Sequence, residues 1–249
     1  MYSALVLAGG ESFCVDENGE PTQEALLNID GRPMLSYVID ALEQSALISN
    51  IFIAGSDCLA ILSSSERVRF VRSGDSIFDT LLLGTAAAGS PEKILLVTTD
   101  IPLVTGDVID KFIRSCEQNE ADFYYPVIAK QVMLTMFPTS KRTYFRLRDG
   151  IFTGGNIFVA KSSILPGCKA AVRKITDNRK KPWRLAAMLG WFNLFKFICG
   201  SMSVHDAQIA ANNILEIKTC VIDFPYAQIG MDVDKLSDVI AIENYLKKK

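Results

Sequence analysis

The chain has 249 residues, of which 49% are hydrophobic and 22% charged, and its formal net charge at pH 7 is −2. This length can bury a substantial core, as one large α/β domain or as a domain with an insertion. The balanced charge argues against a nucleic-acid partner, because nucleic-acid-binding domains usually carry a basic face.

The six cysteines indicate a reducing compartment. They are scattered through apolar segments and no two form a CxxC pair, so neither a zinc finger nor thioredoxin-type chemistry is predicted. The apolar run before Gly9 and Gly10 is too short for the core of a signal peptide. We expect a cytoplasmic protein without a membrane span.

The first half of the sequence alternates short apolar runs with helical patterns, which predicts parallel βαβ units. One helix begins at Pro33 as its first residue, a second covers about 76–88, and a third follows Thr105 as its N-cap. The predicted strands are Ser3–Ala8, Asn50–Ala54, Val68–Val71, Lys93–Thr98 and Asp122–Ile128.

The second half departs from this alternation. Two of its strands are joined by Asp149-Gly150, a dipeptide suited to a tight turn. Positions 161–215 read as mostly helical, so one domain over 1–249 with a helical insertion at about 161–215 is the simplest organisation. The other predicted elements are the strands Arg142–Arg148, Phe152–Ala160 and Lys218–Asp223 and a helix at about Lys235–Leu246.

The segment LVLAGG at 5–10 is an apolar strand that runs into two glycines. Glycine permits positive φ, and its backbone N–H groups can approach a phosphate closely. The residues that follow are unexpected, because positions 11–24 hold five acids and no Lys or Arg. Such a loop is a poor cradle for a triphosphate.

Three aspartates are candidate metal ligands. Asp100 follows an apolar run, and ligands collect at the carboxyl ends of strands in an open parallel sheet. Asp232 and Asp234 are two residues apart in an extended segment, so both project to one side and repel each other unless a cation lies between them. Carboxylates in such positions suit Mg²⁺. The alternatives are a helix-capping or turn role for Asp100 and N-capping for Asp234.

Gly154 and Gly155 interrupt a predicted strand, and Asn156 follows them with a side-chain amide. Glycine within a strand marks close approach of a ligand or of another backbone, and a simple bulge is the alternative. Three nearby arginines, Arg142, Arg146 and Arg148, alternate in sequence and would share one face of a strand. That face could bind an anion or could be the solvent side of a sheet, and the second alternative is somewhat favoured.

The single histidine, His205, lies beside Asp206 at a predicted helix start and is assigned a structural or surface role. Without it no Ser/His/Asp or Cys/His arrangement can be built, so nucleophilic hydrolysis is disfavoured.

Trp183–Cys199 is strongly apolar, with six large apolar side chains within Trp191–Ile198. A helix that is apolar nearly all round is buried or meets another apolar surface. The segment is short for a membrane span and Lys196 interrupts it. Burial within the insertion, a homodimer interface and contact with a membrane surface remain alternatives.

Five segments, in this order, resemble the MobA-like nucleotidyltransferases of the nucleotide-diphospho-sugar transferase superfamily. They are LVLAGG at 5–10, ALLNIDGRPML at 25–35, TTDIPLV at 98–104, TGGNIFV at 153–159 and DVDKLSDV at 232–239. The resemblance implies a Rossmann-like α/β/α sandwich with a mainly parallel sheet. It also implies transfer of a nucleoside monophosphate from an NTP to a phosphorylated small-molecule acceptor, with release of pyrophosphate and with Mg²⁺ as cofactor.

The resemblance also assigns roles to residues. Asp100 would bind Mg²⁺, and Asp232 or Asp234 would supply a second carboxylate. Because an acceptor phosphate is already an anion, no strong general base is required, and catalysis can consist of positioning and charge neutralisation. The nucleotide-binding residues would be Leu7, Ala8, Gly9 and Gly10, and the substrate-binding residues Gly154, Gly155 and Asn156.

The first loop differs from the family pattern at two positions. The family places an arginine a few residues after the glycines, where this chain reads Ser12 to Val15, and a lysine before the AL pair, where it has Glu24. Two hypotheses therefore stand. The favoured one is a Mg²⁺-dependent nucleotidyltransferase, and the alternative is a catalytically degenerate relative that binds a nucleotide or a protein partner.

Overall fold

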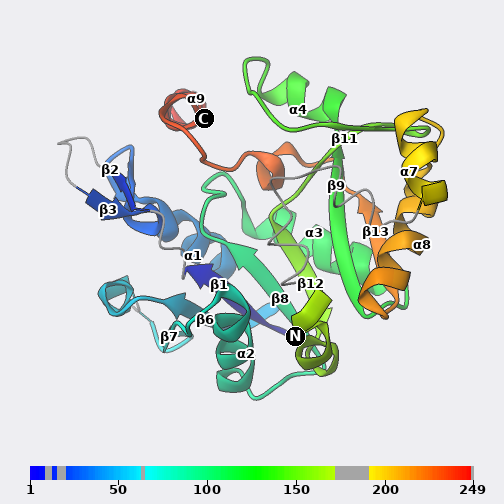
Figure 1. Ribbon diagram of the computed structural model, residues 1–249. Helices are drawn as coiled ribbons and strands as arrows, with labels where there is room; N and C mark the ends of the chain where they lie inside the picture. The colour runs from blue at the N-terminus through cyan, green and yellow to red at the C-terminus, as the bar shows by residue number, and fades with distance from the viewer. Residues whose placement is uncertain (9–12, 16–20, 63–64, 172–190, 248–249) are drawn as a thin grey trace.

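The computed structural model describes residues 1–8, 13–15, 21–62, 65–171 and 191–247. Its first strand, β1 (Tyr2–Ala8), pairs in parallel with β6 (Ile48–Gly55) on one side and β8 (Lys93–Thr98) on the other. Alternate residues of β1 are buried on opposite faces of the sheet, because helices cover both faces (Figure 1).

One sheet of nine strands crosses the molecule in the order β10-β11-β9-β12-β8-β1-β6-β7, with β13 paired to β9. Among the pairs, β12 is antiparallel to β8 and β9, and β11 is antiparallel to β9, whereas β13 is parallel to β9. The remaining strands are β7 (Val68–Arg72), β9 (Phe123–Ala129), β10 (Phe145–Leu147), β11 (Gly150–Gly154), β12 (Ile157–Lys161) and β13 (Thr219–Asp223).

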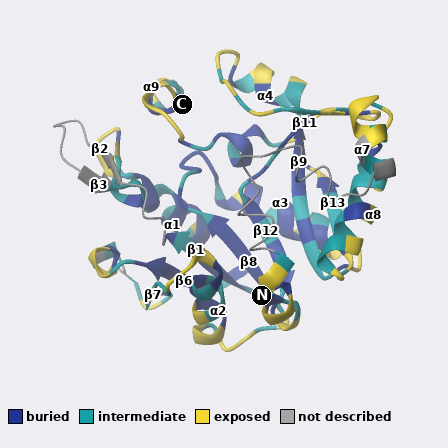
Figure 2. Cartoon of the chain, viewed as in Figure 1, coloured by how far each residue is buried: buried dark blue, intermediate teal, exposed yellow. Residues whose placement is uncertain are grey.

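The core lies on both faces of this sheet. On one face Ala4 and Val6 of β1 share a cluster with the apolar sides of α1 (Met34–Gln44) and α3 (Gly106–Glu117). On the other face Leu5 packs with residues of α2 (Ile77–Ala87). Figure 2 shows the buried strands between partly exposed helices. The expected three-layer α/β/α fold with a mainly parallel sheet is confirmed.

Two helices, α2 and α3, begin with hydroxyl caps, of which that at Thr105 was predicted. The Ser76 hydroxyl accepts the N–H of Asp79 at 3.1 Å, and the Thr105 hydroxyl accepts that of Val108 at 3.4 Å. Pro33 is the cap residue before α1 rather than its first helical residue. The last helix, α9, spans Leu236–Leu246, close to the predicted range.

Two strand predictions were wrong in extent. Of Arg142–Arg148 only Phe145–Leu147 forms β10, because Arg142 leaves the sheet to contact residues near the C-terminus. The run Phe152–Ala160 is two strands, β11 and β12, because the antiparallel pairing with β9 is interrupted after Gly154, which pairs with Val127, and resumes in a shifted register at Val159, which pairs with Tyr124. A tight turn joins β10 and β11 as predicted, but its two residues are Arg148 and Asp149, and Gly150 is the first residue of β11.

Several short elements complete the fold. The helix α4 (Lys130–Met136), which the sequence pattern did not reveal, follows β9. Two small hairpins precede α1, namely β2 (Phe13–Val15) with β3 (Pro21–Gln23) and β4 (Asn28–Ile29) with β5 (Arg32–Pro33). The short 3-10 helices are η1 (Glu24–Leu26), η2 (Asp57–Leu62), η3 (Ser162–Cys168) and η4 (Ala227–Gly230).

The described part of the expected insertion is helical. It contains η3, α7 (Trp191–Ile198) and α8 (Val204–Leu215), whereas residues 172–190 lie outside the described ranges. The division into one domain with an insertion stays a prediction. Among the described helices none combines the length and the apolar character needed to cross a membrane.

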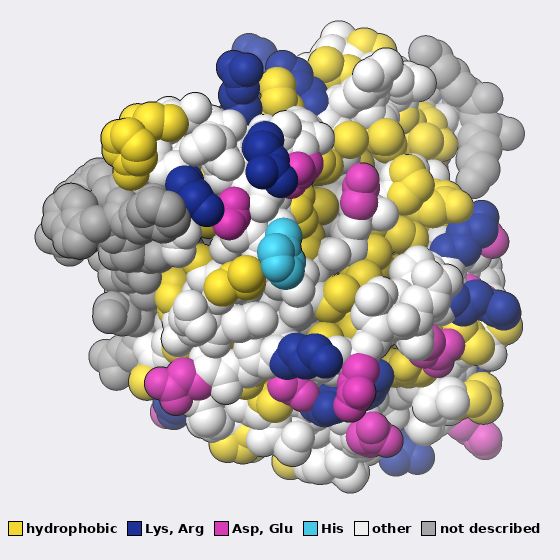
Figure 3. Space-filling model, turned by 90° about the vertical axis from the view of Figure 1, so that its right-hand side faces the viewer, with side chains coloured by type: hydrophobic (Ala, Val, Ile, Leu, Met, Phe, Trp, Pro, Cys, Tyr) yellow, Lys and Arg dark blue, Asp and Glu magenta, His cyan; other side chains and the backbone are white. Residues whose placement is uncertain are grey.

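The face of the molecule that carries α7 and α8 is shown in Figure 3, where hydrophobic side chains lie between charged ones. On α7, Phe195 is 65% and Ile198 73% exposed. Burial within the insertion therefore does not hold for these side chains. Residues 183–190 of the predicted apolar segment are outside the described part of the chain.

Candidate active site

The ends of β1 and β8 place two groups of candidate residues at one edge of the sheet. Leu7 is paired with Thr98 at the end of β8, and Ala8 with Gly55 at the end of β6. Both nucleotide-binding candidates on β1 therefore lie beside the segment that carries Asp100. Gly9 and Gly10 lie outside the described residues, so their role stays a prediction.

Asp100 and the segment Asp232–Asp234 meet directly. The backbone N–H of Val233 donates to the carbonyl oxygen of Asp100 at 2.9 Å, and the Thr98 hydroxyl donates to the Asp100 carboxylate. These two segments are therefore adjacent at this edge of the sheet. Asp234 is not the N-cap of α9, because Lys235 holds that position and the Asp238 carboxylate accepts the N–H groups of Asp234 and Lys235.

The break between β11 and β12 is built into the same edge of the sheet. The N–H of Gly155 donates to Pro126 at 3.0 Å and that of Asn156 to Ile229 at 2.9 Å, while the Asn156 carbonyl accepts the N–H of Thr98 at 3.2 Å. Asn156 thus links the end of β8 to η4, which leads into Asp232. The break is therefore of the bulge type, because β11 and β12 pair with the same strand, β9, before and after it and the register shifts between them.

Close packing around Gly155 leaves no room for a side chain. A Cβ there would lie 2.8 Å from Cδ1 of Ile229 and 3.0 Å from Cγ of Pro126. We expect Gly155→Ala to lower the free energy of unfolding by about 1–3 kcal/mol, the usual cost of overpacking. Gly167→Ala is the matched control, because a Cβ there meets nothing within 4 Å. Equal urea midpoints for the two variants would contradict this account.

Arg142 supplies the cation between the two late aspartates. Its Nη1 lies 2.5 Å from Oδ1 of Asp232 and 3.7 Å from Oδ2 of Asp234, and its side chain is only 5% exposed. The repulsion expected between the two carboxylates is thus relieved by a residue from the loop before β10. Arg146 and Arg148 are exposed, so the three arginines do not share one strand face.

A cavity of about 460 Å³ opens beside these groups. The substrate-binding candidates Gly154, Gly155 and Asn156 line it together with Asp232 and Asp234, whereas Asp100 does not. Arg142, one of the alternating arginines of the sequence analysis, lines it as well. The remaining lining residues were not assigned a role from the sequence, although Lys235 directly follows Asp234. They are the cations Lys141 and Lys235, the aromatic residues Tyr125 and Phe158, and Thr143 and Thr153.

Four carboxylates influence one another at this edge of the sheet. Burial raises the pKa of Asp100 to about 6, with smaller contributions from Glu24 and Asp234, while the hydrogen bond from Thr98 opposes the rise. Burial also raises the pKa of Asp232 to about 6, against the attraction of Arg142. The pKa of Glu24 is raised by burial and then by Asp234 and Asp232. Glu24 is therefore close enough to Asp234 and Asp232 to interact electrostatically with them.

The aspartates do not form a ready-made metal cage. Among the residues that the structure describes, no three or more His, Cys, Asp or Glu side chains are grouped so that they could hold a metal ion. Asp232 is paired with Arg142, and Asp100 accepts a hydrogen bond from Thr98. A metal ion bound by Asp100, Asp232 and Asp234 together does not fit this arrangement, so their metal role stays a prediction.

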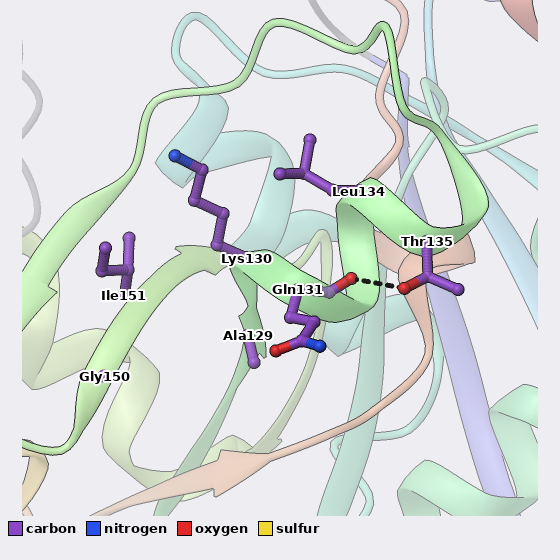
Figure 4. Close-up of a pocket in the computed structure, with 7 residues that line it drawn as sticks. All are labelled: Ala129, Lys130, Gln131, Leu134, Thr135, Gly150 and Ile151. Carbon is purple, nitrogen blue, oxygen red and sulfur yellow. Dashed lines mark hydrogen bonds between the residues drawn. The ribbon is translucent and has the colours of Figure 1, made fainter.

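A second, larger cavity of about 610 Å³ lies between α4 and β11. Figure 4 shows its lining, in which the Thr135 hydroxyl donates to the Gln131 carbonyl at 2.8 Å and Lys130 is the only charged residue. It holds none of the candidate residues. The polar cavity beside Asp232 is therefore the better candidate site.

His205 is exposed on α8, in keeping with the predicted surface role.

Comparisons with known proteins agree with this geometry. A solved structure of a hypothetical transferase from Thermus thermophilus matches with a TM-score of 0.80 and 31% identity, over 96% of this chain and 99% of that one. A 4-diphosphocytidyl-2C-methyl-D-erythritol synthase from Anaerococcus prevotii matches with a TM-score of 0.60 over 99% of this chain. At 14% identity the second likeness shows the fold alone.

The sequence relatives point the same way. A Pyrococcus horikoshii protein named "Probable molybdenum cofactor guanylyltransferase" is 31% identical over 115 residues, which span 45% of this chain and 54% of that protein. The family model for the MobA-like NTP transferase domain matches residues 4–183. This match covers most of the chain and includes the end of β1, Asp100 and the break at Gly154–Asn156. The chain therefore belongs to the MobA-like NTP transferase family.

Proposed function

We propose that this protein transfers a nucleoside monophosphate from an NTP to a phosphorylated small molecule and releases pyrophosphate. The observation that carries the proposal is the meeting of Asp100, the Asp232–Asp234 segment and the Gly154–Asn156 break at one edge of the sheet. A polar cavity lined by Lys141, Arg142 and Lys235 adjoins this meeting point. Nucleotide binding at β1 and acceptor binding in the cavity would bring the two substrates together.

The chemistry needs no histidine. A phosphate oxygen of the acceptor attacks the α-phosphorus of the NTP, the bond from that phosphorus to the bridging oxygen breaks, and pyrophosphate leaves. The attacking oxygen is already anionic, so the protein has to position two anions and neutralise their charge. Lys141 and Lys235 line the cavity and are exposed, so their ammonium groups can reach an acceptor phosphate.

Mg²⁺ is our proposed cofactor. When bound to the phosphates of the nucleotide, it would neutralise their charge, and proteins usually hold such an ion through one or two carboxylates and the phosphates themselves. Asp100, at the end of β8, is the carboxylate that we assign to it.

The proposal is tested by measuring pyrophosphate release with each of the four NTPs and a panel of sugar and alcohol phosphates. We expect release with at least one pair, and a loss of about 100-fold or more in Asp100→Asn, the usual effect of removing one charge-stabilising group. Asp57→Asn, an exposed acid on η2, is the control and should leave the rate unchanged. Release that persists in Asp100→Asn would contradict the assigned site.

The second candidate function is binding without turnover. It is favoured by Glu24, an acid that interacts electrostatically with Asp234 and Asp232 at the position where the family has a lysine. A protein that binds an NTP in calorimetry but releases no pyrophosphate with any acceptor of the panel would belong to this class.

We also propose that the protein works in the cytoplasm and forms a homodimer through the apolar segment 183–199. The exposed side chains of Phe195, Phe197 and Ile198 on α7 support an apolar contact there. Light scattering on the purified protein distinguishes a homodimer from a monomer, and a monomeric mass would contradict the proposed homodimer.

A further inference from the structure

Arg142 makes all its described polar contacts with one short segment. Besides the ion pairs of Nη1 with Asp232 and Asp234, its Nη2 donates to the carbonyl oxygen of Asp232 and lies 3.7 Å from Sδ of Met231. These groups are about 90 positions away in sequence. A guanidinium can serve a carboxylate and a carbonyl together because its donors are arranged in a rigid fork.

Burial of the Arg142 side chain is energetically unfavourable, which indicates a functional role. Its side chain is 5% exposed, and its Nε is buried without a hydrogen-bond partner. A buried donor left unpaired is unfavourable, and arginine is rarely buried unless a partner compensates it. The compensation here comes from Asp232, whose own side chain is 22% exposed, and less from Asp234, which is 64% exposed.

We propose that Arg142 is the built-in counter-cation of Asp232 and Asp234 and keeps a divalent ion from binding between them. In this arrangement Arg142 is a positioning residue that fixes the segment next to Asp100. The inference rests on the proposed function and deepens it, because it restricts a metal ion to Asp100 and the nucleotide. Its test measures metal binding without substrate. The inference can therefore fail while the transferase proposal stands, and the transferase proposal can fail while the inference stands.

The charges around Arg142 explain why its removal should be visible. Glu24, Asp100, Asp232 and Asp234 interact electrostatically with one another, and Arg142 is the cation paired with two of them. Without the guanidinium, the two late carboxylates would repel each other and would attract a dication instead. With the guanidinium in place, a divalent ion would be repelled by its positive charge and would find the Asp232 carboxylate already paired.

The experiment is a titration of the nucleotide-free full chain with Mn²⁺, followed by the paramagnetic resonance signal of the free ion. We expect Arg142→Gln to bind Mn²⁺ about tenfold or more tightly than the wild type, since one unit charge a few ångströms from a dication matters that much even in water. Arg142→Lys is the matched control, which keeps the cation and should stay within about threefold of the wild type. The double variant Arg142→Gln/Asp232→Asn should lose most of the gain.

A purely structural role for Arg142 predicts lower stability in Arg142→Gln and no gain in Mn²⁺ binding. Unchanged binding in a folded Arg142→Gln protein, as judged by circular dichroism, would overturn the proposal. Should that variant not fold, Asp232→Asn in the wild-type background decides. Mn²⁺ binding that stays within about twofold of the wild type supports the proposal, because Arg142 already covers Asp232, and a loss of about fivefold or more overturns it.

Discussion

Replacing Asp100 by asparagine should make the protein more stable at neutral pH. The pKa of this carboxyl is raised from 3.8 to about 6, chiefly because it is buried. Such a rise corresponds to roughly 2–3 kcal/mol of unfavourable free energy for the ionised carboxylate in the folded state. Asparagine carries no charge and can still accept the hydrogen bond from Thr98, so it removes this cost and keeps the contact.

The pH dependence follows from the sign of the shift. Between about pH 4 and pH 6 the folded protein binds a proton at Asp100 that the unfolded chain has already released, so the wild type loses stability as the pH rises through this window. The gain from Asp100→Asn should therefore be near zero at about pH 3.5, grow between pH 4 and pH 6, and be complete at about pH 7.

Urea unfolding of the wild type and Asp100→Asn at several pH values measures this gain. The exposed control Asp57→Asn, whose partner Arg72 is also exposed, should stay within about 0.5 kcal/mol of the wild type at every pH. A variant that is less stable than the wild type at pH 7 would contradict the burial argument. Together with the expected loss of pyrophosphate release, a gain would mark Asp100 as a residue kept for function at the expense of stability.

The position of Asp100 could be predicted because the signal is local. The apolar run Ile94–Val97 lies within β8 as expected, and the carboxyl end of a parallel strand is where ligands collect. The helices after Ser76 and Thr105 could also be predicted from the sequence, because each begins with a hydroxyl that caps its own first turn. Signals of this kind lie within a few residues of the feature that they predict.

The role of Arg142 could not be predicted because its partners are distant in sequence. Alternation with Arg146 and Arg148 favoured a strand face, but the attraction of Asp232, about 90 positions away, takes Arg142 out of the strand. The split between β11 and β12 has a similar cause, since the pairing with β9 is interrupted where Asn156 donates to Ile229, a residue distant in sequence. Glu24 could be singled out only through the resemblance, as the residue at the family's lysine position, and its interaction with Asp234 and Asp232 is a result of the fold.

Replacing Glu24 by lysine should tighten the binding of an NTP. Glu24 begins η1, is partly buried, and interacts electrostatically with Asp232 and Asp234. A carboxylate in this place repels triphosphate, whereas an ammonium attracts it. At about 4 Å the change from repulsion to attraction is worth a few kcal/mol where the site is partly shielded, and under about 2 kcal/mol in full solvent.

The gain in nucleotide affinity should be smaller than this, because a lysine at this position would also be attracted to the aspartates of the protein. We therefore expect about tenfold tighter binding, which corresponds to roughly 1.4 kcal/mol. Glu24→Gln removes the repulsion without adding attraction and should give a smaller gain of about threefold. Both gains should shrink as the salt concentration rises, because screening weakens interactions between partly exposed charges.

Calorimetric titration with Mg-CTP and Mg-GTP, at low and at high salt, measures these differences. Glu120→Lys is the matched control for net charge, since this exposed residue precedes β9 and lies at the opposite edge of the sheet from the end of β8. Its affinity should equal that of the wild type. If the wild type binds measurably and Glu24→Lys binds no more tightly, the phosphates do not pass near this position, and the acidic first loop would not be what limits nucleotide binding.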